Sequence, residues 1–250
     1  MIDMHSHILY GIDDGAKSEE MSLKMLTLSK ENGVDEIVAT PHFMKGRFNY
    51  EYQEVIKLVE KLQRLAEENG IDIKIYCGQE VYYSKNLIEY YNEGVIGTIN
   101  NSKYMLIELP MIEFNIEEVI DSIYELQIRG ITPIIAHPER YKLFIKKPSM
   151  INKFISEGYL FQLNSGSVVG DFGKDVKKTA KVFLDHNIYS VVGSDAHRDR
   201  GRSTDVNEFL NIIDEKCRIN LKNNSQKILN NKEIESGAIK IKEKKWFWQK

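Results

Sequence analysis

The chain has 250 residues, 42% of them hydrophobic, which is enough for one large core and suits an α/β barrel in a single domain. Its formal net charge of −3 argues against a nucleic-acid-binding protein, which usually carries a strongly basic face. No stretch approaches the roughly 20 apolar residues that span a bilayer, and we expect no signal peptide. The distant cysteines Cys77 and Cys217 indicate neither a disulfide framework nor a zinc ribbon, so we expect a cytoplasmic protein.

Short runs rich in β-branched and aliphatic residues alternate with segments of helical periodicity, a pattern typical of parallel strands joined by crossover helices. We predict seven strands, over Ile2–His7, Glu36–Thr40, Ile71–Cys77, Tyr104–Leu109, Thr132–Ala136, Leu160–Leu163 and Tyr189–Val192. The clearest helix is predicted over Glu51–Asn69, which ends before Gly70. Asn115 and Glu118 form a helix-start capping pair, and that helix ends at Gly130. Seven such βα units could close into a barrel.

The end of the chain differs from the rest in composition. From Lys240 to Lys250, lysines are mixed with Trp246, Phe247 and Trp248. This pattern fits contact with a membrane surface or a partner, and it equally fits a solvated terminus. We therefore assign residues 1–239 to one barrel domain and residues 240–250 to a basic-aromatic tail.

Metal-binding side chains recur at the carboxyl ends of the predicted strands. They are His5, His7, His42, Glu80, Glu108, His137, Asp195 and His197. In a parallel barrel the loops that leave this face converge, so we expect these side chains to lie together. One His-x-His pair alone is more often incidental, but of the six histidines only His186 lies in a helical segment without this context. The sequence therefore predicts one shared metal site.

The number and type of these side chains indicate the chemistry. Residues two apart on an extended strand share a face, so His5 with His7 can bind one ion, as can Asp195 with His197 if their segment stays extended. Nitrogen and oxygen ligands in this number exceed the need of one tetrahedral zinc, and the lack of thiolates favours manganese, iron or zinc. Two or three ions are therefore expected, in a centre suited to phosphoryl transfer to water.

Arginines near the predicted ligands are candidates for phosphate binding, because guanidinium groups bind phosphate oxygens bidentately. Arg140 lies in a His-Pro-Glu-Arg segment, and Arg198, Arg200 and Arg202 follow His197. We interpret Arg198 and Arg200 as surface charges. The residues alone do not single out Arg140 and Arg202.

These residues, in this order, resemble the polymerase and histidinol phosphatase (PHP) superfamily, and more closely the bacterial manganese-dependent protein-tyrosine phosphatases of the CpsB and YwqE group. The similar stretches are MIDMHSHILYGIDDGAKS at residues 1–18, ATPH ending at His42, GQEVYY around Glu80, LIELP around Glu108, ITPIIAHPERY ending at Tyr141, QLNSGS at residues 162–167, and GSDAH followed by GR at residues 193–202. The likeness covers nearly the whole chain. It implies an α/β fold with a single distorted (β/α)7 barrel of the PHP type.

The resemblance also implies roles for individual residues. The eight side chains would bind three divalent ions, with manganese expected and iron or zinc as alternatives. Arg140 and Arg202 would hold the phosphate, and Asp14 would act in a catalytic loop. Hydrolysis would proceed through a metal-activated hydroxide and would need no cysteine. Residues 203–204 are Ser and Thr where many relatives have prolines, so the geometry of the loop that carries Arg202 is the part least supported by the resemblance.

The implied substrate is a phosphotyrosine protein, such as a bacterial tyrosine kinase that regulates capsular or extracellular polysaccharide synthesis. A small-molecule phosphatase such as histidinol-phosphate phosphatase would use the same metal chemistry and stays open. A non-catalytic PHP metal-binding module and a nuclease are further alternatives, both disfavoured by the acidic net charge. The sequence predicts no oligomeric state.

Overall fold

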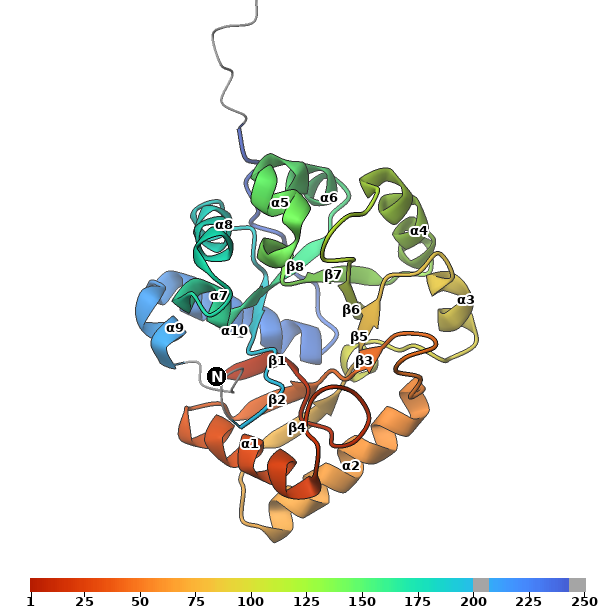
Figure 1. Cartoon of the computed structure of the whole chain (residues 1–250), viewed down its shortest axis with the longest axis vertical. Helices are drawn as coiled ribbons and strands as arrows, with labels where there is room; N and C mark the ends of the chain where they lie inside the picture. Colours follow the sequence, from red (N-terminus) through yellow and green to blue (C-terminus); the bar gives the residue numbers. More distant parts are fainter. Residues whose placement is uncertain (200–206, 243–250) are drawn as a thin grey trace, which may run out of the picture.

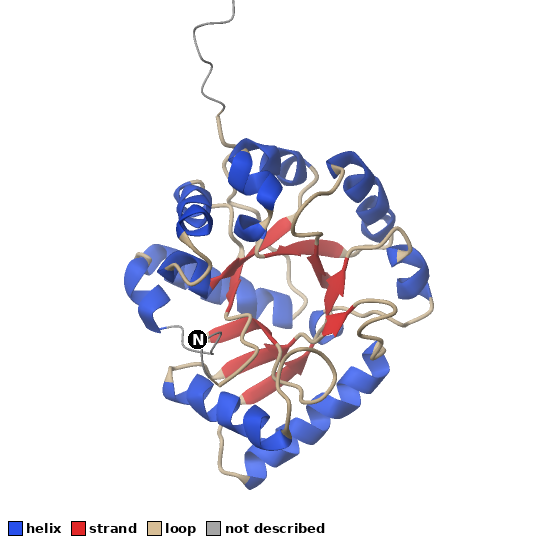
Figure 2. Ribbon diagram, viewed as in Figure 1, coloured by secondary structure: helices blue, strands red, loops and turns tan. Residues whose placement is uncertain are grey.

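The structure is a computed structural model of the chain, and it describes residues 1–199 and 207–242. These residues form a parallel α/β fold with two sheets, ordered β1-β2-β4 and β3-β5-β6-β7-β8-β9. The strands are β1 (Ile2–Ser6), β2 (Glu36–Ala39), β3 (His42–Phe43), β4 (Lys74–Cys77), β5 (Glu80–Tyr82), β6 (Tyr104–Glu108), β7 (Thr132–Ala136), β8 (Leu160–Asn164) and β9 (Val191–Gly193). They curl around a common centre (Figure 2).

Helices cover the outside of the curled strands (Figure 1). They are α1 (Glu19–Glu31), α2 (Tyr52–Glu68), α3 (Leu87–Asn92), α4 (Ile116–Ile128), α5 (Lys142–Lys146), α6 (Asn152–Ser156), α7 (Ser165–Val169), α8 (Lys174–Asp185), α9 (Asn207–Ile212) and α10 (Glu215–Leu229), with 3-10 turns at Ile99–Asn101, Pro138–Arg140 and Pro148–Ile151. In the described part of the chain, no helix combines the length and apolar character that crossing a membrane requires.

The two sheets meet where β1 lies beside the segment that follows β9. His7 donates its backbone N–H to the carbonyl of Ala196 at 2.9 Å, and Asp195 donates to the carbonyl of His5 at 2.7 Å. The buried carboxylate of Asp3 strengthens this junction, because it accepts hydrogen bonds from the Ser194 amide at 2.9 Å and the Ser194 hydroxyl at 2.6 Å. The first and last strands therefore lie side by side, although they are far apart in sequence.

The second and third predicted strands are each followed by a short strand that was not predicted. The path of β2 bends at Pro41 and resumes as β3, and the path of β4 bends at Gly78 and resumes as β5. Backbone hydrogen bonds continue through the bends, from Glu80 to Pro41 at 3.0 Å and from Gly78 to Ala39 at 2.9 Å. The short strands β3 and β5 were not predicted, because two or three residues are too few to show a strand period.

The start of β4 also differs from the prediction that placed a strand over Ile71–Cys77. Ile71 donates its amide to the carbonyl of Ala66 at 2.9 Å. This bond makes Ile71 part of the turn that ends α2, and β4 begins only at Lys74. The last strand runs over Val191–Gly193, two residues later than its predicted start.

The predicted helices are confirmed. The segment predicted over Glu51–Asn69 is α2, which begins with a capping box between Glu51 and Glu54. Asn115 caps α4, where its side-chain oxygen accepts hydrogen bonds from the amides of Glu117 and Glu118 at 3.0 and 3.4 Å.

Ile241, in the first part of the predicted tail, lies beside Asn152 of α6. Ile241 donates its amide to Asn152 Oδ1 at 2.8 Å, and its carbonyl accepts from Asn152 Nδ2 at 2.9 Å. The aromatic residues predicted to distinguish the tail, Trp246, Phe247 and Trp248, lie outside the described residues.

The inner face of the strands changes from apolar to polar toward their carboxyl ends. Leu106 and Val191 belong to a buried apolar cluster inside the curled sheets. Glu108 follows Leu106 by two residues on β6 and therefore shares its face. The apolar cluster thus forms the base beneath a polar site.

The contact between β1 and β9 leaves no space for a side chain at Gly193. A Cβ atom there would lie 2.4 Å from His5 Cβ and 2.8 Å from the His5 amide nitrogen. Gly193→Ala should therefore lower the free energy of unfolding by about 2–3 kcal/mol, because the two strands must separate. Urea denaturation measures this, and Gly237→Ala is the control because no atom lies within 4 Å of its added Cβ. Equal stability of the two variants would contradict this account of the junction.

Candidate metal centre

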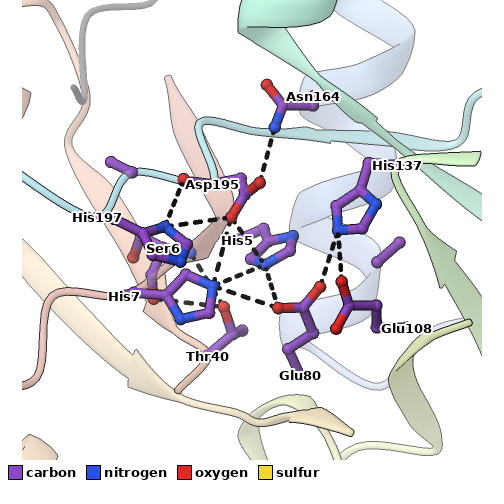
Figure 3. Close-up of polar contacts among 12 residues, drawn as sticks. His5, Ser6, His7, Thr40, Glu80, Glu108, His137, Asn164, Asp195 and His197 are labelled. Atoms are coloured by element: carbon purple, nitrogen blue, oxygen red, sulfur yellow. Dashed lines mark hydrogen bonds and ion pairs between the residues drawn. The ribbon is translucent and has the colours of Figure 1, made fainter. Parts of the chain in front are cut away.

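All eight side chains predicted to bind metal gather at the carboxyl ends of the strands, and Figure 3 labels each of them except His42. They are His5 and His7 from β1 and the residue after it, His42 from β3, Glu80 from β5, Glu108 from β6, His137 after β7, and Asp195 and His197 after β9. They form part of the lining of a cleft of about 550 Å³ or lie buried beneath it. The predicted convergence of these residues is confirmed.

The most buried group contains His5, His7, Glu80 and Asp195, whose ligand atoms lie within 4.8 Å of one another. The Nε2 atoms of His5 and His7 are 3.2 and 3.3 Å from Glu80 Oε2. The same nitrogens are 3.6 and 3.4 Å from Asp195 Oδ1. Two imidazoles and two carboxylates therefore point at a common position.

Two further groups share members with the first. One contains His7, Asp14, His42 and His197, and in it Asp14 Oδ1 lies 3.3 Å from His197 Nε2 and 3.6 Å from His42 Nε2. The other contains His42, Glu80 and Glu108. His137 lies beside this last group, with Nε2 at 2.9 Å from Glu80 Oε1 and 3.8 Å from Glu108 Oε1.

Hydrogen bonds on the far side of three imidazole rings, those of His5, His7 and His197, fix which nitrogen faces the cluster. His5 Nδ1 lies 2.9 Å from Gln162 Oε1, an oxygen that also accepts the His137 amide at 3.1 Å. Gln162 Nε2 donates to the carbonyl of Leu163 at 2.7 Å, which fixes the orientation of the amide. The His5 proton is therefore on Nδ1, and the lone pair of Nε2 faces Glu80 and Asp195.

His7 and His197 are oriented in the same way. His7 Nδ1 lies 2.7 Å from the buried carboxylate of Asp13, and His197 Nδ1 lies 2.9 Å from the carbonyl of Asp195. Asp13 is itself held by the amides of Gly15 at 2.8 Å and His42 at 3.0 Å. A carboxylate behind an imidazole is common where the imidazole binds a metal ion, because it fixes the tautomer and raises ligand basicity.

Burial and neighbouring charges shift the pKa values of the cluster in different directions. Burial and the nearby carboxylates of Glu80 and Asp195 raise the pKa of Glu108 to about 9. Burial and the charge of Arg140 lower the pKa of His137 to about 4, so this ring is neutral and can offer a lone pair. Positive charge between the carboxylates would relieve their repulsion.

Several polar atoms in the site are buried without a hydrogen-bond partner. They are Asp14 Oδ1, His42 Nδ1, Glu80 Oε2 and His137 Nδ1. Buried polar atoms are rarely left unsatisfied unless an ion or water binds there. Three of these atoms belong to residues of the groups described above, so the donor set fits divalent cations.

Arg140 lies at the edge of the cluster. Its Nη1 atom donates to Asp195 Oδ2 at 2.5 Å, and Asn164 Nδ2 donates to the same oxygen at 2.9 Å. The guanidinium stacks 4.4 Å from the centre of the Phe172 ring. This arrangement holds Arg140 in the cleft wall, beside the position that the other Asp195 oxygen shares with His5 and His7.

The condition attached to one geometric expectation is not met. Asp195 and His197 were expected to bind the same ion if their segment stayed extended, but Asp195 has a left-handed φ of 52°. The two side chains consequently belong to different groups. His137 also departs from strand geometry, with φ of 30°, and such backbone conformations cluster at functional sites.

Two other predicted residues lie away from the cluster or outside the description. His186 ends α8, where Nδ1 lies 2.8 Å from the carbonyl of Val182, in agreement with a role outside the metal site. Arg202, predicted to hold phosphate, lies outside the described residues, as do Ser203 and Thr204.

The sequence matches, over residues 1–233, the family described as "Capsular polysaccharide synthesis, CpsB/CapC". The chain belongs to the CpsB/CapC family. It is 32% identical to CapC of Staphylococcus aureus, with 99% of each chain covered. It is 34% identical to the tyrosine-protein phosphatase CpsB of Streptococcus pneumoniae, with 86% of this chain and 90% of that protein covered.

A solved structure supports this assignment to the CpsB/CapC family. It comes from a study of YwqE from Bacillus subtilis and CpsB from Streptococcus pneumoniae, described as unique metal-dependent tyrosine phosphatases. The two folds match with a TM-score of 0.91 at 29% identity, over 97% of this chain and 100% of the other. The curled parallel sheet is therefore the fold of this family.

Three supporting residues of this CpsB/CapC protein were not assigned roles from the sequence. Asp13, Gln162 and Asn164 hold His7, His5 and Asp195 through the hydrogen bonds described above. Gln162 and Asn164 belong to the QLNSGS stretch and lie at the carboxyl end of β8, where the other strands carry site residues. Their position at a strand end was the one feature of the sequence that could have indicated these roles. Asn and Gln are not part of the His and carboxylate pattern by which the metal ligands were predicted.

Asp13→Asn should weaken manganese binding by about 10–100-fold, because an amide cannot fix the His7 tautomer as a carboxylate does. Isothermal titration calorimetry measures the affinity, with Asp121→Asn on the exposed face of α4 as the matched control. The role of Asp13 is contradicted if both variants bind manganese as the unsubstituted protein does.

Proposed function

We propose that this CpsB/CapC family protein is a metal-dependent protein-tyrosine phosphatase, a phosphoric monoester hydrolase. The observation that carries the proposal is the cluster of imidazoles and carboxylates at the base of an open cleft, with Arg140 in the cleft wall. The names of the relatives support the same reaction, since CpsB of Streptococcus pneumoniae is a tyrosine-protein phosphatase.

We further propose that the centre binds three divalent ions, with manganese as the expected metal. The three groups of possible ligands support this number, and His137 adds a nitrogen to the group of His42, Glu80 and Glu108. Bound ions would lower the pKa of a bound water and neutralise the charge of a phosphate.

The residues of the chain supply orientation and charge. Arg140 presents a guanidinium that can bind the non-bridging oxygens of a phosphate, while Asn164 keeps Asp195 directed toward the cluster. Asp14 has a half-exposed carboxylate at the cleft, and its hydrogen bond with the His197 imidazole lowers its pKa, which keeps the carboxylate ionised. A role for Asp14 in a catalytic loop is proposed on the strength of the family resemblance. Arg202 is proposed as a second phosphate ligand on the strength of the family resemblance.

The depth of the site favours phosphotyrosine. His5, Glu80 and Asp195 are almost fully buried, whereas the residues at the mouth of the cleft are exposed. A phosphate must therefore reach well below the surface. Tyrosine carries its phosphate at the end of a long rigid side chain, while a phosphoserine would have to bring the peptide backbone into the cleft.

The biological setting is proposed from the family. A bacterial tyrosine kinase that controls capsular or extracellular polysaccharide synthesis would be the substrate protein, in accordance with the family description. The free cysteines Cys77 and Cys217 suit a reducing cytoplasm. Residues 240–250 would contribute any contact with a membrane surface or partner.

The fold is proposed to be one distorted (β/α)7 barrel over residues 1–239. The proposal treats β2 with β3, and β4 with β5, as single bent strands. The backbone hydrogen bonds that cross both bends support this interpretation, as does the contact between β1 and the end of β9.

Removal of divalent ions should abolish turnover of a phosphotyrosine peptide, and added manganese should restore it. His5→Ala should lower turnover by about 100-fold or more, because it removes a nitrogen from the most buried group. A phosphate-release assay measures both, with His186→Ala as the matched control. Full activity in the presence of chelator, or equal activity of the two histidine variants, would refute the proposal.

Arg140→Ala should lower turnover by about 100-fold while metal content stays unchanged, because the guanidinium stabilises charge on the phosphate. Arg129→Ala is the control, since Arg129 is an exposed residue whose guanidinium donates to Asn92 Oδ1 at 2.6 Å and does not line the cleft. A Cys77→Ser/Cys217→Ser variant should retain activity, because neither thiol lines the cleft. Loss of turnover in a folded, metal-loaded cysteine variant would indicate a thiol mechanism instead.

A further inference from the structure

The mouth of the cleft contains a cation that the proposed chemistry does not use. Arg47 and Phe48 line the cleft from the segment between β3 and α2. Arg47 is exposed, and among the residues that the structure describes it forms no ion pair with a carboxylate. This charge therefore lies, available to a ligand, at the mouth of the cleft where the phosphate is proposed to bind.

A tight hairpin fixes the position of Arg47. Met44 and Phe48 exchange backbone hydrogen bonds at 2.9 and 2.8 Å, and Arg47 donates its amide to the Met44 carbonyl at 2.9 Å. The turn uses Gly46 at a φ of 88°, where a side chain would be strained. The backbone that carries Arg47 is therefore held in one conformation.

Stacking extends this order to the side chains. The Phe48 ring stacks on His42 with ring centres 5.6 Å apart and an angle of 11° between the planes. The Arg47 guanidinium lies 4.8 Å from the centre of the Phe48 ring, within cation–π distance. His42, Phe48 and Arg47 thus form a column from the metal cluster to the mouth, and the guanidinium is held beside the entrance.

The segment between β6 and α4 lines the same mouth with different chemistry. Ile112 is 68% exposed, an unusual environment for a large aliphatic side chain at the entrance of a polar cleft. Glu113 follows it and also lines the cleft. A bound peptide would therefore meet a cation on one segment, and an apolar side chain with an anion on the other.

We propose that this mouth selects phosphotyrosine peptides with an acidic residue beside the phosphotyrosine. Arg47 binds the carboxylate of that residue, and Ile112 packs against the tyrosine ring. Glu113 repels a carboxylate on its own side, so the acidic neighbour is accepted only near Arg47. This inference rests on the proposed phosphatase function and identifies the class of substrate that the same site prefers.

The charge of Arg47 is tested with two phosphotyrosine peptides that differ only in whether Glu or Gln flanks the phosphotyrosine. The manganese-loaded protein should turn over the Glu peptide with a KM about fivefold lower, the size expected for one partly exposed ion pair. Arg47→Gln should remove this preference and leave kcat, and turnover of phenyl phosphate, unchanged.

Lys45→Gln is the matched control for charge. Lys45 lies on the same hairpin but points toward Tyr90, with Nζ 5.9 Å from its ring centre, and it does not line the cleft. It should keep the preference for the Glu peptide. The inference is overturned if Arg47→Gln keeps the preference, or if Lys45→Gln loses it to the same extent, since either result assigns the effect to the general charge of the surface.

The apolar contact has a separate test. Ile112→Ser should raise KM about threefold for both peptides without changing their ratio, because it removes apolar contact with the shared tyrosine ring. Ile128→Ser is the control, since Ile128 is 60% exposed on α4 and does not line the cleft. Equal KM values for the two variants would remove Ile112 from the recognition surface.

These results are distinguishable from failure of the proposed function. If the metal-loaded protein hydrolyses neither peptide nor phenyl phosphate, the phosphatase assignment is wrong and the inference falls with it. If it hydrolyses both peptides equally, the assignment stands and the selection by Arg47 is wrong.

Discussion

The repulsion among the buried carboxylates of Glu80, Glu108 and Asp195 is the constraint that shapes this site. Burial disfavours their charged forms, and the charges of Glu80 and Asp195 further disfavour ionisation of Glu108, whereas nearby imidazoles hold the pKa of Glu80 well below its usual range. The elevated pKa of Glu108 expresses this cost. Five imidazoles and the guanidinium of Arg140 surround the carboxylates, and divalent cations would offset the repulsion that raises the pKa of Glu108. Without such cations, burying three acids together beneath a cleft would be energetically unfavourable.

The same constraint explains why the site is held so firmly. A metal-binding nitrogen is useful only if its lone pair faces the ion, so the opposite nitrogen needs a fixed acceptor. Asp13 and Gln162 provide acceptors for His7 and His5, and each is bonded to backbone as well. Asp3 binds Ser194 and thereby keeps Asp195 close to β1. The contacts that stabilise the junction between the first and last strands therefore also hold the site residues in position.

The cleft combines a rigid base with an exposed mouth. The base is formed by strand ends above an apolar cluster, and its chemistry would serve any phosphate monoester that reached it. Selection among esters must then depend on the mouth, where Arg47 and Ile112 come from two different connecting segments. Separation of this kind allows the mouth to change without disturbing the ligands beneath it.

The sequence by itself determined the parallel α/β class, the main helices and the complete set of eight candidate ligands. It could do so because strand period, helix caps and ligand chemistry are local properties, and because parallel strands bring their carboxyl ends together. Tertiary structure alone decided which residues share a group. With the left-handed backbone at Asp195, its carboxylate and the His197 imidazole belong to different groups of possible ligands, and the bends at Pro41 and Gly78 bring His42 and Glu80 into register. The supporting roles of Gln162 and Asn164 were likewise invisible, because a hydrogen bond between distant strands depends on distances in space that no sequence period records.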